Sequence, residues 1–223
     1  MENTIKQLIQ SCGADVCGIA NIHSFKNAPQ GFSPRDIYPD CNAVIMFGLA
    51  LPKGLTQVDS RLIYGYYNTF SCTEVDRIAF QSAKLMEKEF GAIAVPLPCD
   101  SPYEYWEKDT LTGKGMLSMK HAAVLAGLGV LGKNSLLINP QYGDLLTIGA
   151  ILTNLELQSD KPCEEICLES CKKCINACPV HAIEDGVVNQ KLCREYTYGK
   201  TERGFDIVDC NRCRVVCPRK FGI

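Results

Sequence analysis

The stretch Cys171-Lys-Lys-Cys174-Ile-Asn-Ala-Cys178-Pro179 has a CxxCxxxCP spacing that returns at Cys210-Asn-Arg-Cys213-Arg-Val-Val-Cys217-Pro218. Of the 14 cysteines in the chain, nine lie from Cys163 to Cys217. Paired runs of this kind, each ending in Cys-Pro, are typical of proteins that hold two iron–sulfur clusters by cysteine thiolates. The end of the chain is therefore predicted to bind two 4Fe-4S clusters and to move single electrons.

The spacing also predicts which cysteine binds which cluster. In two-cluster ferredoxins the cysteine of each Cys-Pro pair ligates the cluster opposite its own run. Cys193 is the only unassigned cysteine between the two runs, and it completes the second set. The predicted ligands are Cys167, Cys171, Cys174 and Cys217 for cluster one, and Cys178, Cys193, Cys210 and Cys213 for cluster two.

One ligand of cluster one is left open by the sequence. Position 168 is Leu, so the leading cysteine gives Cys167-x3-Cys171, one residue earlier than the bacterial pattern. Cys163 therefore competes with Cys167 for this place. A pair of structural zinc sites is the alternative, because CxxC pairs also bind zinc. The doubled CxxxCP and the isolated Cys193 favour two cubane clusters.

Composition excludes several classes of protein. The chain has 223 residues, 46% of them hydrophobic, and a net charge of −2. No apolar run approaches the ~20 residues of a membrane span, and the first residues do not form a signal peptide. We therefore expect a cytoplasmic protein without membrane attachment. In a reducing compartment, clustered cysteines are more often ligands than disulfides.

Charge is unevenly distributed. From residue 191 onward eight basic residues stand against four acidic ones. They are Lys191, Arg194, Lys200, Arg203, Arg212, Arg214, Arg219 and Lys220 against Glu195, Glu202, Asp206 and Asp209. This excess is interpreted either as compensation for anionic clusters or as a face that binds a partner.

The rest of the chain reads as an α+β fold. Residues 73 to 76 form a capping signal before a long amphipathic stretch that Gly91 closes. The expected helices are 4–11, 75–90 and 118–126, and the expected strands are 16–20, 43–51, 92–96, 135–138 and 145–153. Residues 159–162 are expected to be a linker. We therefore predict a mixed reductase-like domain at 1–157 and a small ferredoxin-like two-cluster domain at 158–223.

A glycine motif lies between these regions. Gly127-Leu-Gly129-Val-Leu-Gly132 satisfies GxGxxG, but a helix precedes it and a strand follows it, which is the reverse of a dinucleotide fold. Glycines still let a backbone approach a bulky ligand closely. The candidate cofactor-binding residues are Gly127, Gly129, Gly132, Lys133, Asn134 and Ser135.

The segment from His121 to Ile138, followed by Leu145-Leu-Thr-Ile-Gly-Ala-Ile-Leu-Thr-Asn and the cysteine runs, resembles the epoxyqueuosine reductase (QueG) family. The resemblance spans nearly the whole chain, and the reductive dehalogenases are more distant relatives. It implies a cobalamin-binding reductase domain fused to a two-cluster domain that delivers electrons to the cobalt. It also implies that Cys193 ligates cluster two, and that an external donor of the ferredoxin or flavodoxin type supplies the electrons.

The chain also departs from the family. Family members continue past the second Cys-Pro into a helical-repeat region that helps bind transfer RNA, whereas this chain ends at residue 223. A short form is therefore expected, which acts on a small molecule or a corrinoid rather than on transfer RNA. The family's acid lies shortly before AGLG, and Asp109 is the nearest match, with Asp100 farther away. Asp109 and His121 are the candidate proton donors.

Two functions of different classes follow from these features. The first is an iron–sulfur reductase of the epoxyqueuosine reductase type, in which two clusters pass electrons to a cofactor, cobalamin among the candidates, or to a substrate in the first domain. The second is a non-catalytic electron carrier or reductive activator that docks on another protein. Iron, sulfide and cobalt contents distinguish them.

Overall fold

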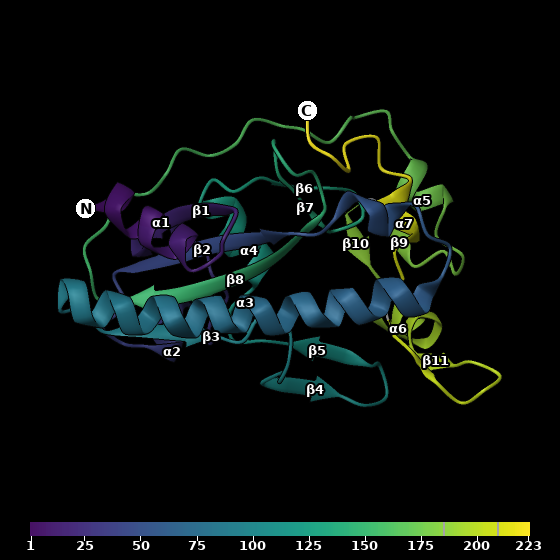
Figure 1. Cartoon of the computed structure of the whole chain (residues 1–223), viewed down its shortest axis with the longest axis horizontal. Helices are drawn as coiled ribbons and strands as arrows, with labels where there is room; N and C mark the ends of the chain where they lie inside the picture. Colours follow the sequence, from purple (N-terminus) through teal and green to yellow (C-terminus); the bar gives the residue numbers. More distant parts are fainter. Residues whose placement is uncertain (185, 209) are drawn as a thin grey trace.

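The computed structural model describes residues 1–184, 186–208 and 210–223 (Figure 1). Asp209, one of the acidic residues counted above, lies outside the described residues. The centre of the fold is a four-stranded sheet in the order β1-β2-β8-β3, in which every neighbouring pair is antiparallel. These strands are β1 (Val16–Asn21), β2 (Ala43–Ala50), β8 (Leu146–Thr153) and β3 (Ala94–Leu97).

Alternation along β2 explains why both faces of the sheet are covered. Ile45 and Phe47 point to one face, where they join a core built by α1 (Glu2–Ser11) and α3 (Arg61–Phe90). Val44 and Met46 point to the other face, where they meet α4 (Met119–Leu125). Successive side chains of a strand alternate between faces, so a continuous apolar strand needs cover on both sides. The result is a helix–sheet–helix layering (Figure 1).

Most predicted elements are found close to their expected bounds, but α3 is a correction. The helix expected at 75–90 begins at Arg61, so Thr73 lies inside it and its hydroxyl donates to the carbonyl of Thr69 rather than capping a first turn. Gly91 ends the helix in a left-handed conformation, as expected. No helix in the described ranges is long and apolar enough to cross a membrane.

The remaining elements are short. They are η1 (Ile22–Phe25), α2 (Pro34–Ile37), η2 (Lys53–Thr56), β4 (Tyr105–Glu107), β5 (Thr112–Lys114), β6 (Val130–Leu131), β7 (Leu137–Ile138), α5 (Lys173–Asn176), β9 (Ile183–Glu184), β10 (Val187–Val188), α6 (Gln190–Thr197), β11 (Gly199–Lys200), β12 (Asp206–Ile207) and α7 (Arg212–Val215). The last seven carry or flank the cysteine runs. Such short elements bury little apolar surface of their own.

Residues 154–172, called the strap below, connect β8 to the cysteine runs at the opposite end of the molecule (Figure 1). The expected linker within the strap is held in place. Asp160 accepts hydrogen bonds from the backbone of Ile19 at 2.8 Å and from the amine of Lys6 at 2.5 Å. Leu157 is fully buried in the core beneath α1 and α3. The strap therefore belongs to the packed body of the protein.

Candidate metal centre

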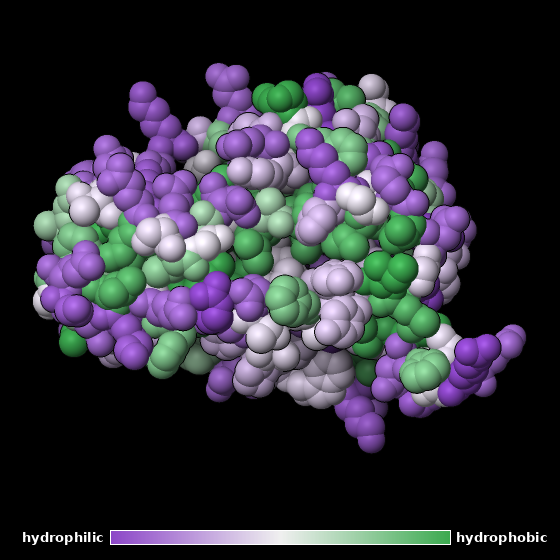
Figure 2. Space-filling model, viewed as in Figure 1, coloured by the Kyte–Doolittle hydropathy of each residue, from purple (hydrophilic) through white to green (hydrophobic). Residues whose placement is uncertain are grey.

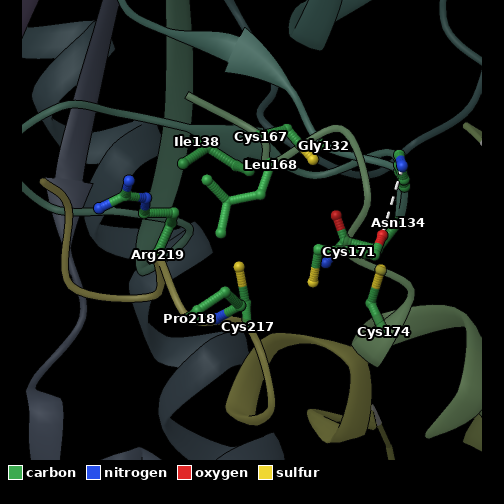
Figure 3. A pocket seen from close by; sticks show the side chains of 11 residues that line it. Gly132, Asn134, Ile138, Cys167, Leu168, Cys171, Cys174, Cys217, Pro218 and Arg219 are labelled. Carbon is green, nitrogen blue, oxygen red and sulfur yellow. Dashed lines mark hydrogen bonds between the residues drawn. The ribbon is translucent and has the colours of Figure 1, made fainter. Parts of the chain in front are cut away.

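Four cysteines line one small cavity. Cys171 and Cys174 come from the first run, Cys167 precedes them in the strap, and Cys217 arrives from the end of the second run. Their labelled sulfur atoms face a common space in Figure 3. The backbone turns that present them are local: the amide of Cys171 donates to Leu168, and that of Cys217 donates to Arg214.

Four other cysteines form a second group, made of Cys178, Cys193, Cys210 and Cys213. Burial raises the pKa of Cys210, and the neighbouring thiols of Cys193 and Cys178 raise it further. Burial raises the pKa of Cys213 to about 12, which the Arg214 charge opposes while Cys210 and Cys193 add to it. Cys178, Cys193 and Cys213 also pack together around Ala182 and Ile183. The four thiols are thus close enough to influence one another.

The two groups exchange their Cys-Pro cysteines. Cys217 belongs to the second run but lies with the thiols of the first, and Cys178 belongs to the first run but lies with those of the second. Contacts between α5 and α7 place the two runs side by side. The sequence rule that assigned each Cys-Pro cysteine to the opposite cluster describes this arrangement.

Cys163, the competitor for the first ligand position, lies outside the first cavity's lining. Its thiol donates to the carbonyl of Gly127 at 3.0 Å. Cys167 lines the cavity instead. The geometry therefore favours Cys167 over Cys163 as the ligand next to Cys171.

Cysteine thiolates bind both zinc ions and iron–sulfur clusters, and the two need different arrangements of the thiolates. Within the described ranges no three His, Cys, Asp or Glu side chains are placed to hold a single metal ion. A zinc site needs thiolates about 2.3 Å from one centre, whereas a cubane spreads four thiolates over four separate irons. Four thiols around a cavity, as in the first group, fit the cubane arrangement better.

Buried cationic groups near the cysteines support the same fit. Arg214 is 8% exposed, and its Nη1 atom has no hydrogen-bond partner among the described residues. The Nε atom of Arg219, a residue that lines the first cavity, is likewise buried without a partner there. Orphaned donors are costly in a protein interior. The sulfur atoms of an anionic cluster are acceptors that would satisfy such donors and oppose their charge.

A buried carboxyl also lies among these groups. Asp144 is 1% exposed, and burial raises its pKa to about 6, while the nearby Arg214 charge lowers it. It is close enough to Cys213 and Cys217 to raise the pKa of both thiols, for each of which burial is the larger cause. Asp144 therefore lies near one cysteine of each group. The sequence carries no motif that would have identified it.

The glycine motif packs against the protein's own backbone. A methyl group at Gly127, whose φ is +71°, would lie 2.4 Å from the carbonyl oxygen of Lys161. A methyl group at Gly129 would lie 2.2 Å from that of Ile138. Real Cβ atoms do not approach so closely, which explains why glycine is needed here. These two glycines allow strand and strap to pass close to the loop, and they do not form an open cradle for a cofactor.

The polar end of the same segment faces the cysteines. Gly132, Lys133 and Asn134 line the first cavity, where Figure 3 labels Gly132 and Asn134. The amine of Lys133 donates to the carbonyls of Glu169 and Cys171. Asn134 is buried and its amide lies 3.5 Å from the carbonyl of Cys213. Ser135 adopts a φ of +61° in the turn that follows. The segment thus forms a wall of the metal centre.

Substituting Gly127 by alanine tests this packing role. The left-handed backbone and the close carbonyl are both unfavourable to a side chain, so we expect the free energy of unfolding to fall by at least about 2 kcal/mol. Urea unfolding followed by circular dichroism measures the change. Gly54→Ala is the matched control, because a methyl group there meets nothing within 4 Å. Equal stability of the two variants would contradict the packing role.

The two candidate proton donors are not brought together. Asp109 is exposed in the turn between β4 and β5. His121 is exposed in the first turn of α4, where its Nδ1 atom lies 2.7 Å from the hydroxyl of Ser118, the helix N-cap residue. No hydrogen bond or ion pair joins Asp109 to His121, both of which are described residues. The geometry gives His121 a side-chain contact with Ser118 at the start of α4 and leaves Asp109 exposed to solvent.

An aromatic contact that the sequence did not predict joins the β4–β5 hairpin to the second cysteine group. The guanidinium of Arg194 lies 4.9 Å from the ring centre of Tyr103 and 4.8 Å from that of Trp106. The amide of Gly113 donates to the side chain of Gln190 at 3.0 Å. Arg194 and Gln190 belong to α6, the helix that carries Cys193. The only sequence signal was a Tyr and a Trp three residues apart.

No family model matches the chain. The epoxyqueuosine reductase of Lactococcus garvieae is 29% identical over 210 residues, which cover 89% of this chain and 57% of that protein. The chain is similar to the epoxyqueuosine reductases. It spans a little over half the length of this relative.

Solved structures show the same fold. An epoxyqueuosine reductase with an epoxyqueuosine-modified tRNA stem loop matches 98% of this chain and 65% of its own with a TM-score of 0.70, at 18% identity. A catabolic reductive dehalogenase matches 98% of this chain and 32% of its own with a TM-score of 0.69, also at 18% identity. The mixed helix and sheet fold is thus shared with epoxyqueuosine reductases and reductive dehalogenases.

Proposed function

We propose that the chain is an iron–sulfur reductase of the epoxyqueuosine reductase type. In this proposal residues 158–223 bind two 4Fe-4S clusters, and residues 1–157 provide the reductase-like domain. The observation that carries it is the division of eight cysteines into two groups of four, with the Cys-Pro cysteines exchanged, on a fold similar to these reductases. The expected ligand sets are those given by the spacing.

The residues around the cysteines suit electron transfer. When bound, the two clusters would supply electrons one at a time. Cys213 and Cys217 lie four residues apart in the chain and belong to different groups, so α7 and the turn after it join the two sites directly. Ile138, Ile166 and Ala182 exclude water around the thiols, and low exposure limits reaction of the clusters with solvent.

Cobalamin is the least supported part of the resemblance. The backbone carbonyls of Lys161 and Ile138 occupy the space beside Gly127 and Gly129. A corrin ring therefore does not fit against these two glycines. A reductive dehalogenase with this fold is described in terms of B12-dependent dehalogenation. The cobalt content of the purified protein is therefore worth measuring.

Transfer RNA enters the proposal through one solved structure. An epoxyqueuosine reductase with this fold binds an epoxyqueuosine-modified tRNA stem loop. This likeness counts against the sequence-based expectation that transfer RNA is not the substrate. We therefore propose the modified stem loop as the first substrate to test, with small molecules second.

A non-catalytic electron carrier is the second candidate. One observation favours it: Asp109 and His121, the two candidate proton donors, are both exposed, and no hydrogen bond or ion pair joins them. A carrier needs clusters but no proton donor. The two candidates therefore agree on the metal centre and differ on the first domain.

Anaerobic purification followed by iron, sulfide and cobalt analysis tests both candidates. About eight irons per chain, a broad visible absorption band and reduction of the modified stem loop are the result expected for the reductase, and the cobalt content shows whether a corrinoid is bound. About eight irons with neither corrinoid binding nor substrate reduction would point to the carrier. A colourless protein that contains zinc would exclude both.

A further inference from the structure

Two cysteines outside the cysteine-rich end lie together where α3 meets β3. Cys72 belongs to α3, and Cys99 is the second residue after the end of β3. These two elements are in contact (Figure 1). The backbone amide of Cys99 donates to the carboxylate of Asp76 at 2.8 Å. Because Asp76 lies one turn after Cys72 on the same helix, this hydrogen bond brings Cys99 beside Cys72.

The two thiols also contact each other. The pKa of Cys99 is raised, first by its side-chain hydrogen bond with Cys72 and then by burial. Cys17 and Cys41 show the contrast, because burial is the largest cause that raises the pKa of each. The thiol of Cys41 donates to a backbone carbonyl, that of Ala43. Cys72 and Cys99 therefore form a dithiol, whereas Cys17 and Cys41 are small members of the two apolar cores.

A small molecule in solution can reach this dithiol. Both cysteines are half-buried, and Cys99 stands between the exposed residues Pro98 and Asp100. Figure 2 shows hydrophilic and hydrophobic side chains mixed at the surface over α3, in the same view as Figure 1. In the ranges that the structure describes, no third side chain of His, Cys, Asp or Glu completes a metal site with the pair. Disulfide formation is therefore the chemistry that two adjacent thiols offer here.

The surroundings give the two thiols different roles. In a hydrogen-bonded pair of thiols, the thiol that accepts the hydrogen bond loses its own proton more easily, and the thiolate is the nucleophile. The charges of Asp76 and Asp100 also raise the pKa of Cys99. Cys99 therefore keeps its proton and donates the hydrogen bond, and Cys72 is the thiol that attacks.

We propose that Cys72 and Cys99 form a thiol site that a low-molecular-weight disulfide oxidises to an intramolecular disulfide. The Cys72 sulfur, after losing its proton, attacks the S–S bond of the oxidant, so that a mixed disulfide forms and one small thiol leaves. Cys99 then loses its proton and attacks the sulfur of Cys72, which releases the second small thiol. The protein loses two protons and two electrons, and the small disulfide gains both. The reaction uses no iron–sulfur cluster, so it goes beyond the proposed function and is independent of it.

The disulfide would tie α3 to the segment that leads into the β4–β5 hairpin. Tyr103 follows Cys99 in this segment, and its hydroxyl donates to the carboxylate of Asp100 at 3.1 Å. The ring of Tyr103 also contacts Arg194 of α6, the helix that carries Cys193. Oxidation would therefore anchor to α3 the start of a segment that reaches the second cysteine group.

Peptide mapping of the full chain, purified without oxygen, tests the proposal. The protein is treated with glutathione disulfide, quenched in acid, denatured in the presence of an alkylating agent and digested with trypsin. Trypsin places Cys72 in the peptide 62–77 and Cys99 in the peptide 89–108, and neither peptide contains another cysteine. We expect the two peptides to be linked, in a product two hydrogens lighter than their sum. Separate glutathione adducts, unmodified thiols, or linkage of either peptide to a cysteine within 163–217 would overturn the proposal.

Serine variants test the order of the two steps. The second step cannot occur in Cys99→Ser, so glutathione should accumulate on Cys72 to at least about ten times the wild-type level. Cys72→Ser lacks the attacking thiol, and its Cys99 should carry at least about tenfold less glutathione than Cys72 carries in Cys99→Ser. Cys12→Ser is the matched control, because Cys12 is also half-buried, and this variant should form the linked product as the wild type does. More glutathione on Cys99 than on Cys72 would overturn the proposed order.

Discussion

Substitution of Cys217 by alanine is expected to remove about four of about eight irons per chain. Cys217 belongs to the second run by sequence, but it lies in the cavity with Cys167, Cys171 and Cys174. Its loss should therefore abolish the cluster held mainly by the first run and leave the other cluster intact. Iron analysis combined with electron paramagnetic resonance of the reduced protein measures the loss.

Cys163→Ala is the matched control for that substitution. Cys163 also belongs to the cysteine-rich region, but its thiol donates to the carbonyl of Gly127. We expect this variant to keep about eight irons. Loss of about four irons from Cys163→Ala would make Cys163 a ligand in the position that the sequence left open between it and Cys167. Full retention of iron in Cys217→Ala would contradict the exchange of the Cys-Pro cysteines between the two groups.

Removal of iron is expected to unfold the cysteine-containing end of the chain and to leave the sheet folded. The sheet half has two extensive apolar cores, which cover both faces of β2 and β8. The apolar clusters around the cysteines have three buried members each, and cysteines make up much of their surroundings. A unit with so little burial depends on bound metal for its stability.

Hydrogen exchange measured by mass spectrometry tests this prediction. After anaerobic chelation, amides of α5, α6 and α7 should exchange within seconds, whereas those of β2 and β8 should keep their protection. Refilling with iron and sulfide should restore protection in the helices. Persistent protection of α7 in the iron-free protein would show that its structure does not need the metal.

The strands of the sheet were predictable because their apolar residues form continuous runs with clear ends. Ala43 to Leu51 is such a run, and β2 covers nearly all of it. The beginning of α3 was not predictable for the opposite reason. Apolar residues of 61–72 occur on both the exposed and the buried side of the helix, so the segment does not divide into an apolar face and a polar face as a typical surface helix does.

At the metal centre, local spacing was informative and distant contacts were not. The CxxCxxxCP runs predicted the two groups of cysteines, because ligands on one short turn have fixed separations. Asp144 and Arg194 could not be found in this way, since each meets its partners only after segments far apart in sequence are packed together. Asp109 shows the reverse case: a family match in sequence that lies in an exposed turn.

The wall that Gly132, Lys133 and Asn134 contribute to the first cavity limits how this protein can be divided. A small ferredoxin carries every residue that surrounds its clusters. Here residues 158–223 provide the thiols, while part of the enclosure comes from a loop encoded before the strap. The cysteine-rich end is therefore not a transferable module: grafted onto another protein, it would bring its ligands but leave one side of the first cavity open.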